Sequence, residues 1–193
     1  YGKESIDTVK GNPYKLADDI WGIGFKTADG IANKMGYENN DPRRCKSGIN
    51  YTLSELADEG HVYAEEEQLV KSAKELLLAD EEPIRNAMAE MVQAEELKTD
   101  GDAIYLPPFY YAEVGTANRL LALLENKATN LFAKPFNIEE ISKSTGIEYD
   151  EVQIQAIKQA VDSKVMVLTG GPGTGKTTTT QGIIAALKNM GLK

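Results

Sequence analysis

The sequence contains few of the residues that build disulfides and metal sites. It has one cysteine, Cys45, and one histidine, His61, among 193 residues. A single cysteine can neither close an internal disulfide nor form a CxxC metal site, and a single histidine cannot build a histidine cluster. We therefore expect neither kind of site. His61, in the stretch DEGHVY, has no partner nucleophile or metal ligand beside it, so we predict a histidine packed between helices.

Long hydrophobic runs are also missing. No apolar run approaches the roughly 20 residues that cross a bilayer, and the first residues, YGKE, do not have the basic and then apolar layout of a signal peptide. We expect no membrane association and a cytoplasmic protein. With 41% hydrophobic residues, the chain can build the core of one ordinary domain or of two small ones.

Acidic residues exceed basic ones, but unevenly along the chain. The net charge is −9. Residues 1–50 hold eight basic and seven acidic residues, residues 51–110 hold four and fifteen, and residues 111–193 hold nine and eight. Nucleic-acid phosphates attract Lys and Arg. The middle third is therefore a poor candidate for phosphate contact, whereas either flanking segment can present a local basic face.

Helical patterns dominate the first two thirds of the chain. Short helices separated by turns come first, and in the stretch FKTADGIANKMG one apolar face recurs at helical spacing. That face consists of Ala28, Ile31, Ala32 and Met35. Longer helices are predicted at about 43–59, 65–78 and 83–96. A hairpin is predicted around Asp100-Gly101. Three helices and a hairpin suggest a winged-helix-like arrangement; the alternative is a small packed helical domain, and the acidic charge favours structure without DNA contact.

The last third alternates helix and strand signals. A helix at about 110–126 carries Leu120, Leu121, Leu123 and Leu124. Helices at about 138–144, 150–161 and 175–190 follow, with a strand at 165–169 before the last of them. The fold class is therefore mainly α, with the first strand and helix of an α/β domain at the end. We expect the domains to span residues 1–41, 42–126 and 127–193.

The stretch VMVLTGGPGTGKTTTT carries the most specific motif of the chain. Gly170, Gly175, Lys176 and Thr177 fit the spacing G-x-x-x-x-G-K-[ST], between an apolar β-branched run and a helical pattern. Glycines let backbone N–H groups approach a polyphosphate, and a helix N-terminus adds a field that favours negative charge. Lys176 is expected to reach the β and γ phosphates of ATP. Thr177 is expected to bind Mg2+ through its hydroxyl.

Hydrolysis also requires an acidic residue at the end of a second strand. The only similar run, LLLADEEP, offers Asp80 and Glu81, but its helical pattern and Pro83 predict a solvated helix end instead. One strand and one helix do not make a doubly wound sheet. We therefore expect a piece of a longer ATPase, with little or no ATPase activity of its own.

The phosphate-binding loop, preceded by EVQIQAI, resembles the start of the motor of RecD-like helicases of superfamily 1, the exodeoxyribonuclease V alpha subunit family. This resemblance implies that the α/β domain is the beginning of a RecA-like P-loop domain. The segment from Tyr1 to Gly36 is similar to the helix-hairpin-helix region that precedes the motor in the long branch of this family. The resemblance implies that Gln153 recognises adenine, with Gln155 as a nearby competitor. It assigns the phosphates to Gly171, Gly173, Thr174, Gly175, Lys176, Thr177 and Thr178. Lys176 and Thr177 would be the catalytic residues, in a motor that moves 5′ to 3′ along single-stranded DNA.

In the helix-hairpin-helix region, the resemblance places a turn at Gly22-Ile23-Gly24. Such a turn lets N–H groups and a helix N-terminus contact a DNA phosphate, with Lys26 and Thr27 close by. Ile20, Ile23 and Ala28 would pack the two helices of the motif together. The alternative to DNA contact is that the turn serves packing only. Three carboxylates oppose DNA contact: Asp18, Asp19 and Asp29. Four aromatic residues can in principle stack on bases, although packing is the favoured role for Trp21, Tyr37, Tyr110 and Tyr111.

The sequence as a whole favours part of an ATP-dependent DNA helicase of recombination or repair. ATP and single-stranded or forked DNA are its expected ligands, and protein partners are not indicated. One alternative is a different P-loop ATPase with an unrelated helical front. Another is a protein-docking module in residues 1–126, whose acidic middle third binds a basic partner. No clustered carboxylates indicate a nuclease site.

Overall fold

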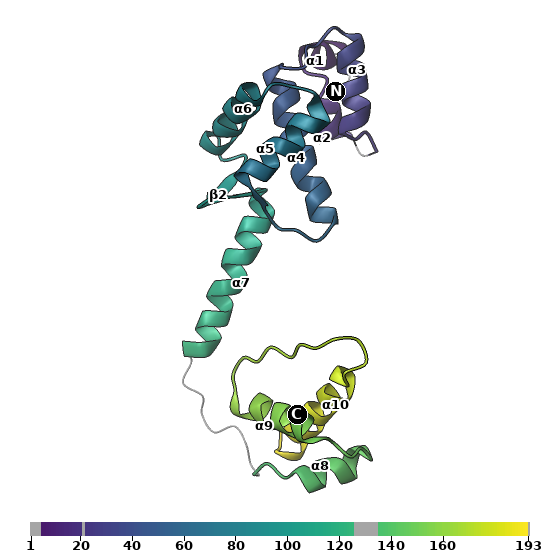
Figure 1. Cartoon of the computed structure of the whole chain (residues 1–193), viewed down its shortest axis with the longest axis vertical. Coiled ribbons are helices and arrows are strands. Elements are labelled where there is room, and N and C mark those ends of the chain that lie inside the picture. Colours follow the sequence, from purple (N-terminus) through teal and green to yellow (C-terminus); the bar gives the residue numbers. More distant parts are fainter. Residues whose placement is uncertain (1–4, 21, 126–134, 193) are drawn as a thin grey trace. The chain divides into compact units, whose positions relative to one another are not determined.

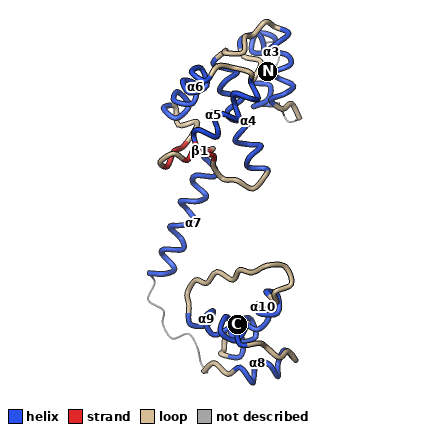
Figure 2. The backbone as a smooth tube through the Cα atoms, viewed as in Figure 1, coloured by secondary structure: helices blue, strands red, loops and turns tan. Residues whose placement is uncertain are grey.

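The computed structural model describes residues 5–20, 22–125 and 135–192. Two compact units make up the chain, Tyr1–Val114 and Gly115–Lys193, and each is described by itself (Figure 1). Helices dominate both units and the strands are short (Figure 2), which confirms the predicted, mainly α fold class. Among the described residues, no helix combines the length and the apolar character that a membrane crossing needs.

Three short helices open the first unit. They are α1 (Ser5–Gly11), α2 (Lys15–Asp19) and α3 (Phe25–Lys34). Asn12 lies in the break between α1 and α2, where its side chain accepts a hydrogen bond from the Tyr14 N–H at 3.1 Å. Such a bond between a short polar side chain and nearby backbone favours a turn over a continued helix. Breaks in the helical pattern therefore divide the described part of residues 5–34 into three short helices.

Three longer helices follow, close to the predicted bounds. They are α4 (Pro42–Asp58), α5 (Glu66–Leu77) and α6 (Glu81–Gln93). Helix α4 begins at a strong start signal, because the Asp41 side chain accepts a hydrogen bond from the Arg43 N–H at 2.9 Å. Proline occupies the first helical position, where no intrahelical N–H bond is lost. The local sequence thus determines where this helix starts.

A small antiparallel sheet completes the first unit. Strands β2 (Lys98–Asp100) and β3 (Ala103–Tyr105) form the predicted hairpin, and Gly101 occupies the left-handed region at φ +58°. Strand β1 (Ala64–Glu65) pairs with β3, which gives the order β1-β3-β2. Sequence analysis missed β1, since two residues are too short to show a strand period. The order helix, strand, two helices and hairpin agrees with the winged-helix-like arrangement expected.

The core of the first unit lies between α3, α4, α5 and α6. Its fully buried side chains include Ala28, Ala32, Cys45, Ile49, Leu69, Leu77, Ile84 and Met91. Met35 was predicted on the buried face of its helix, but its side chain is 39% exposed. The reason is that α3 ends at Lys34, so Met35 turns outward at the helix end. Phe25, at the start of α3, is buried against Tyr51 instead.

One buried ion pair joins the helices of this unit. The Arg44 guanidinium donates to both oxygens of Asp29, from Nε at 2.7 Å and from Nη2 at 2.9 Å. Its Nη1 donates to the carbonyls of Leu77 and Asn39. The Tyr14 hydroxyl donates to the same carboxylate at 2.8 Å. Arg44 therefore ties α3, the loop before α4 and the end of α5 together.

Helix α7 (Pro107–Glu125) crosses the division between the units. Its four predicted apolar positions, Leu120, Leu121, Leu123 and Leu124, are between 41% and 55% exposed. The second unit then contains α8 (Ile138–Thr145), α9 (Glu151–Asp162) and α10 (Lys176–Asn189). All three lie close to their predicted bounds.

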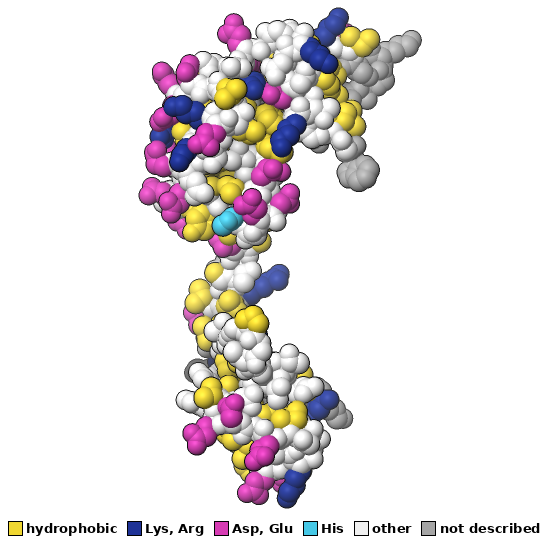
Figure 3. Space-filling view, turned by 45° about the vertical axis from the view of Figure 1, so that its right-hand side comes forward, with side chains coloured by type: hydrophobic (Ala, Val, Ile, Leu, Met, Phe, Trp, Pro, Cys, Tyr) yellow, Lys and Arg dark blue, Asp and Glu magenta, His cyan; other side chains and the backbone are white. Residues whose placement is uncertain are grey.

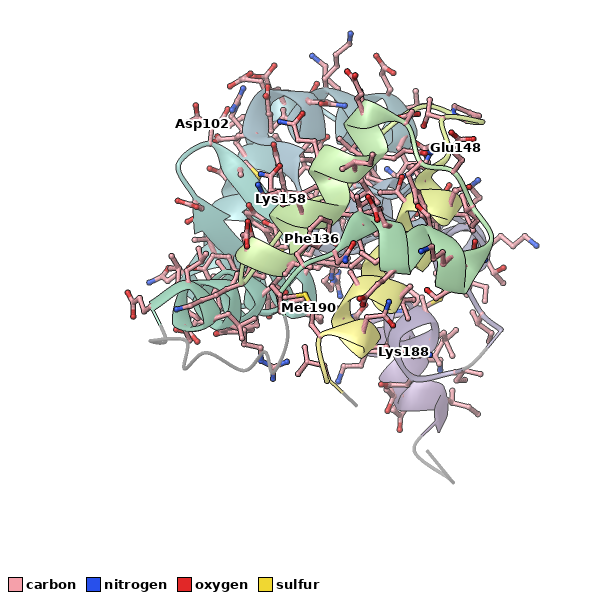
Figure 4. All side chains as sticks on the ribbon, turned by 90° about the horizontal axis from the view of Figure 1, so that it is seen from below. Asp102, Phe136, Glu148, Lys158, Lys188 and Met190 are labelled. Atoms are coloured by element: carbon pink, nitrogen blue, oxygen red, sulfur yellow. The ribbon has the colours of Figure 1, made fainter. Side chains whose placement is uncertain are left out.

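The second unit has its own small core, at the meeting of its three later helices. The buried side chains are Ile141, Tyr149, Ile157, Val161, Ala186 and Met190, and Phe136 packs against them. Figure 4 labels two of these residues, Phe136 and Met190. Gly182 of α10 allows this contact. A Cβ at Gly182 would lie 3.0 Å from Tyr149 Cε1 and 3.1 Å from Ile157 Cγ1. The absence of a side chain there lets α9 and α10 pack closely.

The run 165–169 was predicted as a strand, but it forms no ladder among the described residues. A strand of a parallel sheet needs a hydrogen-bonded neighbour, and the described part of the second unit supplies none. Val167 is 85% exposed as a result. The predicted helix after the run is present as α10, so the fold class holds while the strand pairing does not.

Candidate nucleotide-binding loop and DNA-contacting hairpin

The segment 170–175 forms a sharply turned loop that leads directly into α10. Gly173 has φ +76° and Gly175, the residue before the helix, has φ +75°. A side chain disfavours this left-handed conformation, so both positions require glycine. The glycines of the motif therefore determine the path of the loop, as its spacing predicted.

The N-terminus of α10 presents unpaired donors to this loop. The first bond inside the helix runs from the Thr179 N–H to the Gly175 carbonyl at 2.9 Å. The N–H groups of Lys176, Thr177 and Thr178 precede that bond and have no intrahelical carbonyl to reach. Together with the helix dipole, such donors favour a bound anion. Thr177 is exposed, so its hydroxyl is also accessible.

Lys176 reaches back across the loop. Its Nζ donates to the carbonyls of Gly170 at 2.7 Å and Gly171 at 2.6 Å. The Thr174 hydroxyl donates to the same Gly171 carbonyl at 2.9 Å. An ammonium group, three helix N–H groups and a hydroxyl thus converge on one loop. This donor set fits a polyphosphate, and the Thr177 hydroxyl suits Mg2+, which keeps most of its water.

Gln153 lies beside the phosphate loop and Gln155 does not. Gln153 is the third residue of α9 and forms a capping box with Asp150. The Gln153 N–H donates to Asp150 Oδ1 at 2.8 Å, and the Gln153 Oε1 accepts from the Asp150 N–H at 3.1 Å. A Cβ at Gly175 would lie 2.6 Å from Gln153 Nε2. Gln155 is exposed on the same helix. Of the two candidates, only Gln153 is thus brought to the loop.

The turn at Gly22-Ile23-Gly24 connects α2 to α3. Gly22 has φ +90°, and the Ile23 N–H donates to the Ile20 carbonyl at 3.1 Å. Gly24 caps α3, and its carbonyl accepts from both Thr27 and Ala28. The N–H groups of Phe25 and Lys26 precede these bonds, so the start of α3 offers donors to an anion. The predicted hairpin geometry is present.

Lys26 and Thr27 are exposed on the first turn of α3. The Lys26 Nζ lies 5.5 Å from the centroid of the Tyr51 ring. A hydrogen bond to Tyr51 raises the pKa of Lys26. The ammonium group is thus positioned by α4 at the edge of the turn, close to the donors of α3.

Two expectations about this hairpin need correction. Asp29 was counted as a charge that opposes DNA contact, but Arg44 neutralises it within the fold at 2.7 Å. Ile20 was predicted as a packing residue, yet its side chain is 37% exposed, whereas Ala28 is fully buried and Ile23 half-buried. The reason is that Ile20 falls just after the last residue of the short α2. Trp21 lies outside the described residues.

Asp80, Glu81 and His61 were not expected to be catalytic. Asp80 is the residue before α6 and accepts a hydrogen bond from Asn40 Nδ2 at 2.7 Å, and Glu81 pairs with Arg85. The predicted solvated helix end is therefore confirmed. His61 was predicted to be packed between helices; it is exposed in the loop after α4, because the helix ends at Asp58. No group of three potential metal ligands occurs within the described residues.

Sequence reasoning missed the residues that hold the hairpin in place. Arg44 is 5% exposed and Tyr14 2% exposed, and both bond to Asp29. Burial and the hydrogen bond to Asp29 raise the pKa of Tyr14, so its hydroxyl remains a donor. Nothing in the pair Arg43-Arg44 indicates which arginine is buried. Their positions on α4 decide it, since only the second faces α3.

Two sequence profiles of known families match the chain. The profile described as the ATP-dependent RecD2 DNA helicase HHH domain matches residues 1–63, and that of an AAA domain matches residues 153–193. The first includes the hairpin, and the second begins at Gln153 and includes the phosphate loop. Both matches therefore fall on the two sites that the geometry singles out.

Similar proteins of known function agree with these matches. The ATP-dependent RecD2 DNA helicase of Deinococcus radiodurans is 26% identical over 207 residues, which cover 100% of this chain and 28% of that protein. The RecBCD enzyme subunit RecD of Mycolicibacterium smegmatis is 36% identical over 92 residues, covering 47% of this chain and 15% of that protein. That of Mycobacterium tuberculosis is 35% identical over 86 residues, 45% of this chain and 14% of the relative.

The chain thus spans less than a third of the length of each of these relatives. Within that span, a helix-hairpin-helix match precedes a nucleotide-binding match, in the order that the sequence predicted. The resemblance stated from the residues is confirmed: the sequence is similar to that of RecD-like DNA helicases, from the helix-hairpin-helix region to the phosphate-binding loop.

Proposed function

We propose that this chain forms part of an ATP-dependent DNA helicase that moves 5′ to 3′ and couples ATP hydrolysis to DNA unwinding. The observation that carries the proposal is the loop before α10. Left-handed Gly173 and Gly175, the Lys176 ammonium and the free N–H groups of α10 converge there. This arrangement suits the triphosphate of a nucleotide.

Each residue of the loop then has a role. Lys176 leaves the carbonyls of Gly170 and Gly171 to contact the β and γ phosphates, and the N–H groups of Thr177 and Thr178 contact phosphate oxygens. Thr177 would hold Mg2+ through its hydroxyl, and the bound ion would supply positive charge beside the phosphates. Gln153 pairs with the adenine edge through its amide, close to the loop.

DNA contact is assigned to the hairpin of the first unit. Gly22, Gly24 and the start of α3 offer backbone donors to a phosphate, and Lys26 and Thr27 lie on the same turn. Neutralisation of Asp29 by Arg44 removes one objection to this role. Such contacts carry no base information, so we expect binding to single-stranded or forked DNA without sequence preference.

Unwinding by the whole protein tests this proposal. We expect the substitution Lys176→Ala to abolish ATP-driven unwinding of a duplex with a 5′ single-stranded tail, because phosphate binding is lost, while DNA binding remains within about twofold. Strand separation is measured with a fluorescent fork. The matched control is Thr180→Ala, one turn further along α10, where the hydroxyl bonds only to the helix carbonyl of Lys176. Unwinding by the Lys176 variant at the wild-type rate would contradict the proposal.

The DNA-contacting role is tested separately on the 193-residue chain. Binding of single-stranded, forked and duplex DNA is measured at two salt concentrations. Phosphate contact predicts binding that weakens as salt rises, and weaker binding by Lys26→Ala. Undetectable binding at low salt would instead favour the alternative of a docking module on another P-loop ATPase, which gains no comparable support from the loop or the relatives.

A further inference from the structure

Four tyrosine rings form a continuous row in the first unit. The ring centroids lie 5.3 Å apart between Tyr63 and Tyr105, 5.6 Å apart between Tyr105 and Tyr110, and 5.5 Å apart between Tyr110 and Tyr111. The rings come from three segments: the loop before β1, strand β3 and the start of α7. The tyrosine row, defined by these four residues, takes no part in either site described above.

Both ends of the tyrosine row are open to solvent. Tyr63 is 45% exposed and Tyr111 57% exposed, whereas Tyr105 is 6% exposed and Tyr110 is half-buried. Sequence analysis favoured a packing role for both Tyr110 and Tyr111. The exposures agree with that role for Tyr110 but not for Tyr111. Buried Tyr105 and half-buried Tyr110 contact the two exposed rings and restrict their positions, and rigid exposed aromatic rings are typical of recognition surfaces.

A cavity adjoins one end of the row. It has a volume of about 320 Å3 and is lined by Leu56 of α4, the loop before β1, strand β1 itself and the first turn of α5. Leu56 and Val62 form an apolar part of the cavity wall, and Glu65 and Gln68 form a polar part. Tyr63 belongs both to this cavity and to the tyrosine row. A side chain stacked on Tyr63 therefore has space and a carboxylate beside it.

The surroundings of the row are strongly acidic. Residues 58–67 contain five acidic and no basic residues, and residues 94–113 contain five acidic residues and one lysine. Many acidic side chains are visible on the first unit in Figure 3. Burial and a hydrogen bond to Glu113 raise the pKa of Tyr105, with a further contribution from Asp100, so carboxylates lie close to the rings. This charge repels nucleic-acid phosphates and attracts cationic side chains.

Lys98 illustrates how a cation binds here. Its Nζ lies 5.6 Å from the centroid of the Tyr111 ring and 3.3 Å from Glu95 Oε2. The cation is thus shared by an aromatic ring and a carboxylate. Arginine suits such a position better than lysine, since its planar guanidinium stacks on a ring and pairs with a carboxylate at the same time.

We propose that the tyrosine row docks an arginine-rich segment of a partner protein. Arginine side chains stack on Tyr63 and Tyr111 and pair with neighbouring carboxylates, Glu65 at the cavity and Glu113 on α7. Single-stranded DNA, which also stacks on aromatic rings, is disfavoured by the acidic surroundings. This function is independent of ATP binding and of the helix-hairpin-helix turn.

Binding of a fluorescein-labelled nona-arginine peptide to the 193-residue chain tests the proposal, with fluorescence anisotropy as the readout. We expect Tyr63→Ala and Tyr111→Ala each to weaken binding about threefold, and the double variant about tenfold, because ring stacking of a cation is lost. The matched controls are Tyr63→Phe and Tyr111→Phe, which keep the ring and should bind within about twofold of wild type. Circular dichroism checks that all variants fold.

Charge is tested with a second matched set. Glu65→Gln and Glu113→Gln should weaken peptide binding. The control is Glu90→Gln, which removes one negative charge from α6, where Glu90 pairs with Lys46, and this variant should bind the peptide as wild type does. Equal losses in all three would show general electrostatic attraction and overturn the proposal. Unchanged binding by the double alanine variant would also overturn it. So would displacement of the peptide by a (dT)20 oligonucleotide whose own binding requires the same two rings, which would assign the row to DNA.

Discussion

At the scale of single residues, the buried pair of Asp29 and Arg44 decides how the hairpin is held. Burial opposes ionisation of Asp29, but hydrogen bonds from Arg44 and Tyr14 outweigh it, so the pKa of Asp29 lies below its ordinary value. Arg44 in turn bonds to the carbonyl that ends α5. The turn that we assign to DNA phosphates therefore depends on a contact one helix turn away from it.

This pair predicts a pH dependence of stability. A carboxyl whose pKa is lowered by folding contributes stability above its unfolded pKa of about 4, and that contribution is lost as the pH falls through the folded value. We expect Asp29→Asn to lower the free energy of unfolding at pH 7 by about 3 kcal/mol, because Arg44 is left unpaired. The variant should also show a smaller further loss than wild type between pH 5 and pH 2, as measured by urea unfolding.

The control for this prediction is Glu90→Gln, which breaks the exposed pair with Lys46. An exposed pair contributes at most about 1 kcal/mol, so this variant should unfold close to wild type. Equal stability of the Asp29 and Glu90 variants at pH 7 would contradict the structural role of the buried pair.

At the scale of elements, the contact between α9 and α10 positions the phosphate loop. Gln153 reaches Gly175 only because α9 packs closely on α10, and Gly182 permits that approach. The sequence predicted both helices from their apolar period and the loop from its motif. It did not predict Gly182, because a glycine inside a helix gives no local signal for the neighbour that it meets.

Gly182→Ala tests this packing. The new Cβ would lie 3.0 Å from Tyr149 Cε1, 3.1 Å from Ile157 Cγ1 and closer still to Ile157 Cδ1, so these side chains or the helices must shift. We expect a loss of about 1–3 kcal/mol in the free energy of unfolding of the second unit, which exceeds the roughly 1 kcal/mol gained in helix propensity. Thermal unfolding by circular dichroism measures this loss.

The control is Gly115→Ala in α7. A Cβ at Gly115 meets no atom within 4 Å, so this substitution should be neutral or stabilising. A Gly182 variant as stable as this control would contradict the packing.

At the scale of the whole molecule, local signals predicted more than long-range ones. Helix bounds followed from apolar period and caps such as Asp41 and Pro42, and the phosphate loop followed from glycine spacing. Strand β1, the buried Arg44 and the tyrosine row all depend on segments far apart in the sequence, so no local pattern revealed them. The strand prediction for residues 165–169 failed for the same reason, because a strand forms only when a neighbouring strand pairs with it.

Nucleotide binding at the loop is the most direct measurement of the central claim. ATP with Mg2+ is titrated into the isotope-labelled 193-residue chain, and backbone amide shifts are followed by NMR. We expect the largest shifts at Lys176, Thr177 and Thr178, smaller shifts at Gln153, and loss of all of them in the Lys176→Ala variant. If the amide signals of these residues do not move at millimolar ATP, or if they move equally in the Lys176→Ala variant, the claim that this loop holds the phosphates is contradicted.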